Sequence, residues 1–255
     1  LFRSWRPELP LLAETSGKNA MIVMPSADLD LAASDLVKSA FGHAGQKCSA
    51  ASLAILVGPV ARSERFARQL VDATRSLRVG TPADPRTEVG PVVEPPRGKL
   101  AWALTELEEG EQWLVAPEEI DDVAPEYAGR LWRPGIRVGV RPGSRTHLEE
   151  FFGPMLGVMH AASLEEAIEL QNAVAYGLTA GLYTQDPDDL ARWLDGVEAG
   201  NLYVNRGITG AIVQRQPFGG WKRSSVGAGT KAGGPNYLIG LGSRRSPTGG
   251  GPSSA

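Results

Sequence analysis

The stretch FGHAGQKCSAASLAILVG, residues 41–58, joins the only cysteine of the chain to an apolar run. Residues 52–58 of this stretch, SLAILVG, predict a buried strand, because short apolar runs bounded by turn residues are typical of one. The segment before Cys48 contains two glycines, so the backbone can bend there and present N–H groups near the sulfur. A reactive cysteine needs such a partly exposed, electropositive setting. A lone cysteine is also a common core residue, so these residues leave both interpretations of Cys48 open.

The rest of the chain alternates short apolar runs with helical periodicity. Further strands are predicted over 19–24, 112–116, 178–184 and 201–205. Helices are predicted over 27–41, with Ser26 as the N-cap, over 63–79 and over 99–109. Two more are predicted to begin at the capping box of Ser163 and Glu166 and at Pro187. Strand–helix alternation of this kind predicts an α/β fold with a mostly parallel sheet.

Composition excludes several classes of protein. The 255 residues carry a net charge of −3 with acidic and basic residues mixed, which does not favour nucleic acid or an anionic membrane as a partner. A single cysteine cannot form an internal disulfide, and together with the absence of a visible signal peptide this predicts a cytoplasmic protein. The longest apolar stretch is too short for a transmembrane segment. Residues 243–255 have no periodicity and are predicted to form a disordered tail.

Two acidic positions could support chemistry. Glu14 closes the apolar run LPLLA and precedes Gly17, and burial there would raise the pKa of its carboxyl toward that of a general base. A surface or helix-capping glutamate is the alternative interpretation. In LEEFFGPMLGV (148–158), a carboxylate could accept two hydrogen bonds from a ribose diol and an aromatic ring could pack on a nicotinamide, although an ordinary acidic turn has the same pattern.

Glycines are concentrated between residues 201 and 238. Loops of this composition bring backbone N–H groups close to an anion. The segment GAGTKAGG (227–234) lacks the spacing of a phosphate-binding loop, and no helical pattern follows it. The sequence therefore does not predict a nucleotide-triphosphate site.

Taken in order, these motifs resemble the aldehyde dehydrogenase superfamily from about residue 1 to about residue 241. The motifs that carry the resemblance are AETSGKN (13–19), FGHAGQKCSA (41–50), EEFFGP (149–154), GNLYVN (200–205) and QPFGGWKRSSVG (216–227). The resemblance implies that Cys48 is the nucleophile and Glu14 the general base. It also implies NAD as the cofactor, with Glu150 at the nicotinamide ribose and Phe152 at the nicotinamide ring, and no catalytic metal.

Within that superfamily the chain is most similar to L-glutamate γ-semialdehyde (1-pyrroline-5-carboxylate) dehydrogenases, above all the form fused to proline dehydrogenase in bacterial proline utilisation proteins. The similarity lies in AETSGKNAMIV (13–23), GQKCSA (45–50), YVNRGITGAIV (203–213) and PFGGWKRSSVGAGTKAGGPNYL (217–238). It implies oxidation of the semialdehyde to L-glutamate. Ser49 and an anchor loop around Ser224, Ser225 and Gly227 would hold the substrate carboxylate, although this loop reads Ser-Ser-Val-Gly where the subfamily commonly has Ser-Gly-Thr.

The resemblance also sets expectations about the whole protein. Residues 1–242 correspond to the catalytic half, and the Rossmann-like NAD-binding domain and an oxyanion-binding asparagine are expected upstream of residue 1. We therefore expect the isolated chain to be inactive as a dehydrogenase, and its parent to form a homo-oligomer through a closing strand at 237–244. The sequence does not decide whether a proline dehydrogenase domain is fused upstream in the parent. Two alternatives stay open: an aldehyde dehydrogenase for another small or acidic aldehyde, and a non-catalytic oligomerisation module. The choice between NAD and NADP is not decided.

Overall fold

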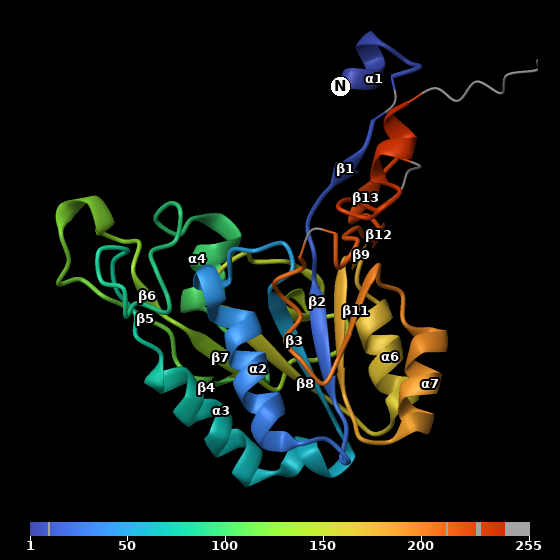
Figure 1. Ribbon diagram of the computed structural model, residues 1–255. Helices are drawn as coiled ribbons and strands as arrows, with labels where there is room; N and C mark the ends of the chain where they lie inside the picture. The colour runs from blue at the N-terminus through green and yellow to red at the C-terminus, as the bar shows by residue number, and fades with distance from the viewer. Residues whose placement is uncertain (10, 213, 228–230, 243–255) are drawn as a thin grey trace, which may run out of the picture.

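A seven-stranded sheet forms the centre of the computed structural model, which describes residues 1–9, 11–212, 214–227 and 231–242 (Figure 1). The strand order is β11-β10-β2-β3-β8-β7-β4, and every neighbouring pair is parallel except β4 and β7. The strands are β2 (Asn19–Val23), β3 (Ala51–Val57), β4 (Gln112–Val115), β7 (Gly135–Val138), β8 (Met155–Ala161), β10 (Thr179–Tyr183) and β11 (Asn201–Val204). The predicted mostly parallel α/β fold is confirmed.

Helices cover both faces of this sheet (Figure 1). On one face lie α2 (Leu29–Phe41) and α3 (Glu64–Ser76), and on the other α6 (Leu164–Asn172) and α7 (Pro187–Gly196). Because β2 is covered on both faces, all five of its residues are buried, as is usual for an inner parallel strand. One core cluster includes Phe41 and Phe66 beneath the first helix pair, and another includes Trp193 beneath the second.

The start of α2 differs from the prediction. Its N-cap is Asp28, whose carboxylate accepts hydrogen bonds from the N–H groups of Asp30 and Leu31, so the expectation that Ser26 caps this helix is wrong. Ser26 Oγ lies 2.8 Å from Thr184 Oγ1 and accepts a hydrogen bond from the N–H of Gln185. The helix begins two residues later than Ser26 allows, and the Asp28 side chain bonds its free N–H groups.

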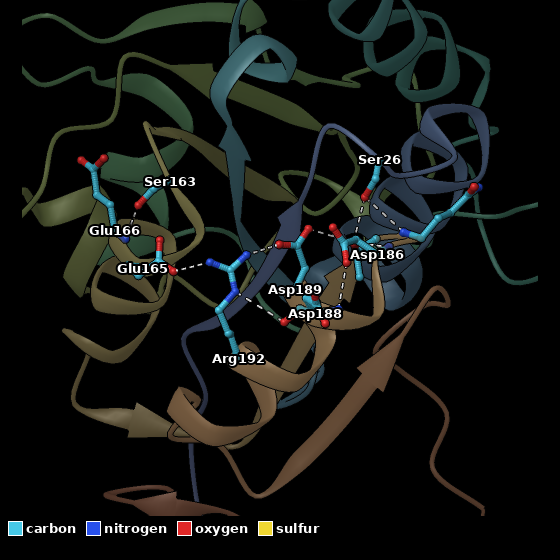
Figure 2. Close-up of polar contacts among 10 residues, drawn as sticks. Ser26, Ser163, Glu165, Glu166, Asp186, Asp188, Asp189 and Arg192 are labelled. Atoms are coloured by element: carbon cyan, nitrogen blue, oxygen red, sulfur yellow. Dashed lines mark hydrogen bonds and ion pairs between the residues drawn. The ribbon is translucent and has the colours of Figure 1, made fainter.

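Figure 2 shows how the two helices of the second face are joined. Arg192 of α7 donates to Glu165 of α6 at 2.7 Å and to Asp189 at 2.6 Å, and the other oxygen of Asp189 accepts from Thr184 Oγ1. The predicted capping box at Ser163 forms in part: its hydroxyl accepts from the N–H of Glu166, while the Glu166 carboxylate bonds the N–H of Ala162.

Two predicted helices are shorter than expected. The helix α3 ends at Ser76 because Leu77 is extended and the carbonyl of Arg78 accepts hydrogen bonds from the loop N–H groups of Glu88 and Val89. The helix α4 (Gly98–Thr105) ends where Glu106 becomes extended. The remaining elements are α1 (Phe2–Trp5), α5 (Arg145–Leu148), β5 (Glu118–Glu119), β6 (Trp132–Arg133), β9 (Tyr176–Gly177), η1 (Gly42–Gly45), η2 (Gly58–Arg62) and η3 (Pro125–Tyr127).

An arm projects from one end of the sheet (Figure 1). It contains β1 (Ala13–Glu14) paired antiparallel with β13 (Ser225–Val226), and near its base β12 (Trp221–Lys222) pairs with β9. Tyr237–Leu241 form the 3-10 helix η4 where a closing strand was expected. The predicted disordered tail, 243–255, lies outside the described residues. Among the residues that are described, the helices are all too short or too polar to cross a membrane.

Candidate active site

The motifs singled out in the sequence precede three neighbouring strands. Residues 14–17 come just before β2, Cys48 before β3, and residues 150–152 before β8. Because β2, β3 and β8 are adjacent and parallel, their amino ends meet at the same edge of the sheet. Open α/β sheets usually bind ligands at the carboxyl ends of their strands, so this placement could not be assumed from the fold class.

The turn before Cys48 has an unusual backbone. His43, Ala44 and Gly45 are consecutive left-handed residues with φ values of 56°, 53° and 67°. A Cβ on Gly45 would lie 2.1 Å from the carbonyl oxygen of Gly153, so this glycine lets two loops approach closely. The turn leaves Cys48 exposed to solvent. The core-cysteine interpretation is therefore wrong.

The buried amide of Asn19 holds the cysteine loop in place. Its Nδ2 donates to the carbonyl oxygens of Cys48 and Ala50, both at 2.8 Å, and its Oδ1 accepts from the N–H of Thr179 at 3.0 Å. Asn19 is 2% exposed, so these bonds satisfy groups that water does not reach. Sequence reasoning missed this residue. The available signal was a polar amide at the first position of a fully buried strand.

Gly17 connects the three motifs. Its N–H donates to Oε1 of Glu150 at 3.1 Å. A Cβ at this position would lie 2.5 Å from the carbonyl oxygen of Cys48, closer than real Cβ contacts come. Glycine is therefore required where the glutamate motif passes the cysteine loop.

Glu150 and Phe152 are two positions apart in the sequence but lie in different environments. Glu150 is 8% exposed, and its Oε1 is bonded to the backbone of Gly17. Phe152 is 39% exposed and has a left-handed φ of 58°. Its carbonyl accepts a hydrogen bond from Gln46 Nε2, whose Oε1 in turn accepts from the N–H of Val93. The two residues thus offer a buried acceptor and an exposed ring.

A cavity of about 550 Å³ opens at Cys48. Part of its lining comes from the segment that follows β11, beyond Val204. This segment packs on α2, where the N–H of Ile208 donates to Ser39 Oγ. It then returns to the start of β11, where Gly219 bonds the side chain of Asn201. The cavity is lined by Gln46, Lys47, Cys48, Ser49, Gly210, Ala211, Gln216, Phe218, Ala232 and Gly233. Sequence reasoning recognised Cys48 and Ser49 but assigned no role to Gly210 and Ala211, although they lie in the quoted motif YVNRGITGAIV.

Glu14 lies in an adjoining cavity of about 510 Å³. Ala232 lines both cavities. Glu14 is exposed, which contradicts the expected desolvation, because β1 lies in the projecting arm, in a two-stranded sheet with β13. Its Oε2 accepts a hydrogen bond from the N–H of Gly220 at 2.9 Å. Burial lowers the pKa of Lys231, and the neighbouring Glu14 opposes that shift.

The structure places the expected anchor residues near Glu14 and away from the cysteine cavity. Ser224 is fully buried, and its hydroxyl donates to the carbonyl of Ser16 and accepts from the N–H of Gly177. Ser225 and Gly227 line the Glu14 cavity. Only Ser49 of the four predicted substrate residues lines the cavity of Cys48.

Comparison with known proteins identifies the family of this chain. The pattern described as the aldehyde dehydrogenase family matches residues 7–239. The 1-pyrroline-5-carboxylate dehydrogenase of Bacillus subtilis is 41% identical over 229 residues, which cover 90% of this chain and 43% of that protein. This chain therefore spans less than half the length of the curated relatives it matches.

Solved structures give the same result. Proline utilization A (PutA) from Corynebacterium freiburgense is 59% identical with a TM-score of 0.91, covering 100% of this chain and 26% of that one. A 1-pyrroline-5-carboxylate dehydrogenase from Thermus with bound NAD is 38% identical with a TM-score of 0.75, covering 89% of this chain and 42% of that one. The chain belongs to the aldehyde dehydrogenase family.

Proposed function

We propose that this chain supplies the cysteine-bearing catalytic part of an NAD-dependent enzyme that oxidises L-glutamate γ-semialdehyde to L-glutamate. The observation that carries the proposal is the exposed Cys48 at the edge of a cavity of about 550 Å³, with Glu14 in the adjoining cavity. The similarity to 1-pyrroline-5-carboxylate dehydrogenases and to PutA supports this substrate.

The proposed reaction begins at Cys48. Its thiolate attacks the aldehyde carbon and forms a thiohemiacetal, while the backbone N–H at the turn stabilises the developing oxyanion. NAD held against Glu150 and Phe152 would supply the hydride acceptor that oxidation of the thiohemiacetal to a thioester requires. Glu14 then removes a proton from water, the water attacks the thioester, and glutamate leaves as the thiolate is restored.

Glu14 must act on a water molecule that reaches the cysteine cavity. Its carboxylate is exposed and held at one oxygen by the N–H of Gly220, which leaves the other oxygen for a proton. Glu14 does not line the cavity of Cys48, although Ala232 lines both cavities, so a movement of the Glu14 side chain toward Cys48 is part of the proposal.

We place the substrate carboxylate among the residues that line the cysteine cavity. The Ser49 hydroxyl and the backbone N–H groups of Gly210 and Ala211 can donate to it, because glycine and alanine leave the backbone accessible. The ring of Phe218 lines the same cavity and can pack on the methylene groups of the substrate. We therefore assign substrate binding to these four residues, and we give Ser224 the role of holding the loop.

The residues at the third motif fit part of a dinucleotide. Oε1 of Glu150 is occupied by Gly17, which leaves Oε2 as the acceptor for a ribose hydroxyl, and the exposed ring of Phe152 can pack on the nicotinamide. The space among these residues is only about 10 Å³, enough for about one water, so the cofactor would contact them from outside. The remainder of the NAD site is proposed to come from a part of the whole protein that lies outside this chain, since the relatives are more than twice as long. For the whole protein we also propose a proline dehydrogenase domain, supported by the similarity to PutA, together with a cytoplasmic location and homo-oligomer formation.

The test is NADH formation from glutamate semialdehyde. We compare this chain with a version extended upstream, each with and without Cys48→Ala. Activity in the extended protein that Cys48→Ala abolishes supports the proposal, and equal activity in the short chain contradicts the proposed origin of the NAD site. Turnover of other short aldehydes but not of glutamate semialdehyde would overturn the substrate assignment.

A further inference from the structure

Gln46 is a residue of the cysteine turn to which the proposed mechanism gives no role. It lies two residues before Cys48, is half-buried, and lines the cysteine cavity. Its side chain bonds two other loops: Nε2 donates to the carbonyl oxygen of Phe152 at 3.1 Å, and Oε1 accepts from the N–H of Val93 at 2.8 Å. These partners are 106 and 47 residues away along the chain. One amide therefore joins the turn of the nucleophile to the residue proposed for the nicotinamide.

The loop of Val93 determines how this amide is oriented. The loop is held by a reciprocal pair of bonds: the N–H of Val92 donates to the carbonyl of Arg130 at 2.9 Å, and Arg130 Nε donates to the carbonyl of Val92 at 2.8 Å. The N–H of Val93 can bond only an acceptor, so it takes the oxygen of the Gln46 amide. The amide nitrogen is then directed to the carbonyl of Phe152, which needs a donor.

Phe152 needs a restraint of this kind because its backbone conformation is uncommon. Its φ is 58°, in the left-handed region that bulky residues rarely adopt, and such conformations persist only where their surroundings hold them. The next residue, Gly153, is already close to the cysteine turn, since a Cβ on Gly45 would lie 2.1 Å from its carbonyl oxygen. The ring of Phe152 is 39% exposed, so its direction depends on the backbone more than on packing. The bond from Gln46 fixes that backbone at the carbonyl of Phe152 itself.

We propose that Gln46 is a positioning residue that holds the Phe152 ring in a fixed place relative to Cys48, so that one framework carries both the nicotinamide contact and the nucleophile. This inference rests on the proposed function, because it takes Phe152 as the residue on which the nicotinamide packs. Hydride transfer requires closely defined geometry between the reacting groups, which two independently moving loops would lose. Gln46 acts through the backbone of Phe152 and not by contact with the cofactor.

The test measures cofactor affinity separately from turnover. In the full-length protein, equilibrium binding of NADH is followed by its fluorescence for Gln46→Met, Gln46→Glu, Phe152→Ala and the double variant Gln46→Met/Phe152→Ala. Gln46→Met removes both bonds with little change of shape and is expected to weaken binding about fivefold, the loss typical of one hydrogen bond. Gln46→Glu keeps an acceptor for Val93 but places an oxygen against the Phe152 carbonyl, so its loss should be at least as large.

A second glutamine provides the matched control. Gln185 is exposed and follows the carboxyl end of β10, whereas the candidate active site lies at the amino ends of the parallel strands. Gln185→Met should therefore bind NADH like the unmodified protein.

The double variant decides the inference. If Gln46 acts by placing the Phe152 ring, Gln46→Met adds little once Phe152→Ala has removed that ring. Equal losses from Gln46→Met in both backgrounds, or unchanged binding in Gln46→Met or Gln46→Glu, would overturn the positioning role. Unchanged binding in Phe152→Ala would instead contradict the cofactor assignment in the proposed function, on which this inference rests. Urea unfolding of each variant shows which ones fold, and Gln46→Glu replaces Gln46→Met in the double variant if Gln46→Met does not fold.

Discussion

The N–H of Gly17 donates a hydrogen bond to Oε1 of Glu150, 3.1 Å away and 133 residues along the chain. This bond joins the glutamate motif before β2 to the EEFFGP motif before β8. The same glycine leaves room for the carbonyl of Cys48, so a single residue contacts both of the other motifs. The local arrangement of the candidate active site therefore depends on a position that has no side chain.

Gly17→Ala should damage this arrangement. The added Cβ would meet Cys48 O at 2.5 Å, so we expect the free energy of unfolding to fall by about 1–3 kcal/mol and the thiol to change its rate of labelling. Gly42→Ala is the matched control, because Gly42 has φ −53° and open space around its Cβ position. Urea unfolding and the labelling kinetics of the single thiol check both variants. Equal effects from the two substitutions would contradict the assigned role of Gly17.

Asn19→Ala should loosen the cysteine loop. It removes the donor to the carbonyls of Cys48 and Ala50 and the acceptor for the N–H of Thr179, all in a buried region. Leaving such groups unpaired is expected to lower the free energy of unfolding by about 2 kcal/mol or more. Hydrogen exchange at the Thr179 N–H, measured in the same samples, should become faster. Unchanged exchange and stability would show that this amide does not hold the loop.

The stability of the chain should depend on the charge of Lys18. Burial lowers the pKa of Lys18 from its ordinary value of 10.5 to about 7. Between these two pH values the unfolded chain carries a proton on Lys18 that the folded chain lacks, so this residue makes stability rise with pH across that window. Below about pH 7 the folded chain also carries the proton, and the cost of burying it is fully present.

Lys18→Met should remove this contribution. The slope of unfolding free energy against pH between 7 and 10.5 should fall by at most about 1.4 kcal/mol per pH unit, the value for one proton. Lys38→Met, at an exposed position, should keep the original slope. A slope that is the same in Lys18→Met and the unmodified chain would mean that Lys18 is not neutral in the folded state above pH 7.

Two neighbouring serines should behave differently. Ser224→Ala removes a buried hydroxyl bonded to Ser16 and Gly177, and we expect a loss of about 1–3 kcal/mol in unfolding free energy. Ser225 is partly exposed, so Ser225→Ala should change stability by no more than about 0.5 kcal/mol. In the full-length enzyme neither should raise the KM for glutamate semialdehyde as much as Ser49→Ala does. A KM effect of Ser225→Ala equal to that of Ser49→Ala would restore the original anchor-loop assignment.

The sequence by itself determined the class of fold and the identity of the motifs. Apolar periodicity was sufficient for the strands β2, β3 and β10, because an inner parallel strand is apolar on both faces and needs no partner to be recognised. The edge strand β11 was also predicted, although its residues alternate between buried and half-buried. Local capping rules were sufficient at Pro187 but failed at Ser26, where a residue two positions later had the better geometry. Strong local signals were therefore enough to predict that these helices and strands exist. The residues at which they begin and end depended on tertiary contacts that cannot be read from the sequence.

Tertiary structure decided which motif residues meet. The strand order, which is not the order along the chain, gathers the starts of β2, β3 and β8 at one edge and so joins residues 17, 48 and 150. The return of the segment after β11 placed Gly210 and Ala211 beside Cys48, and left Ser225 and Gly227 beside Glu14. The spacing of residues along the chain does not predict which of them share a cavity, because the path of a loop depends on packing and hydrogen bonds with residues distant in sequence. For the same reason, only the fold revealed that Glu14 is exposed and that Lys18 is buried against Phe151.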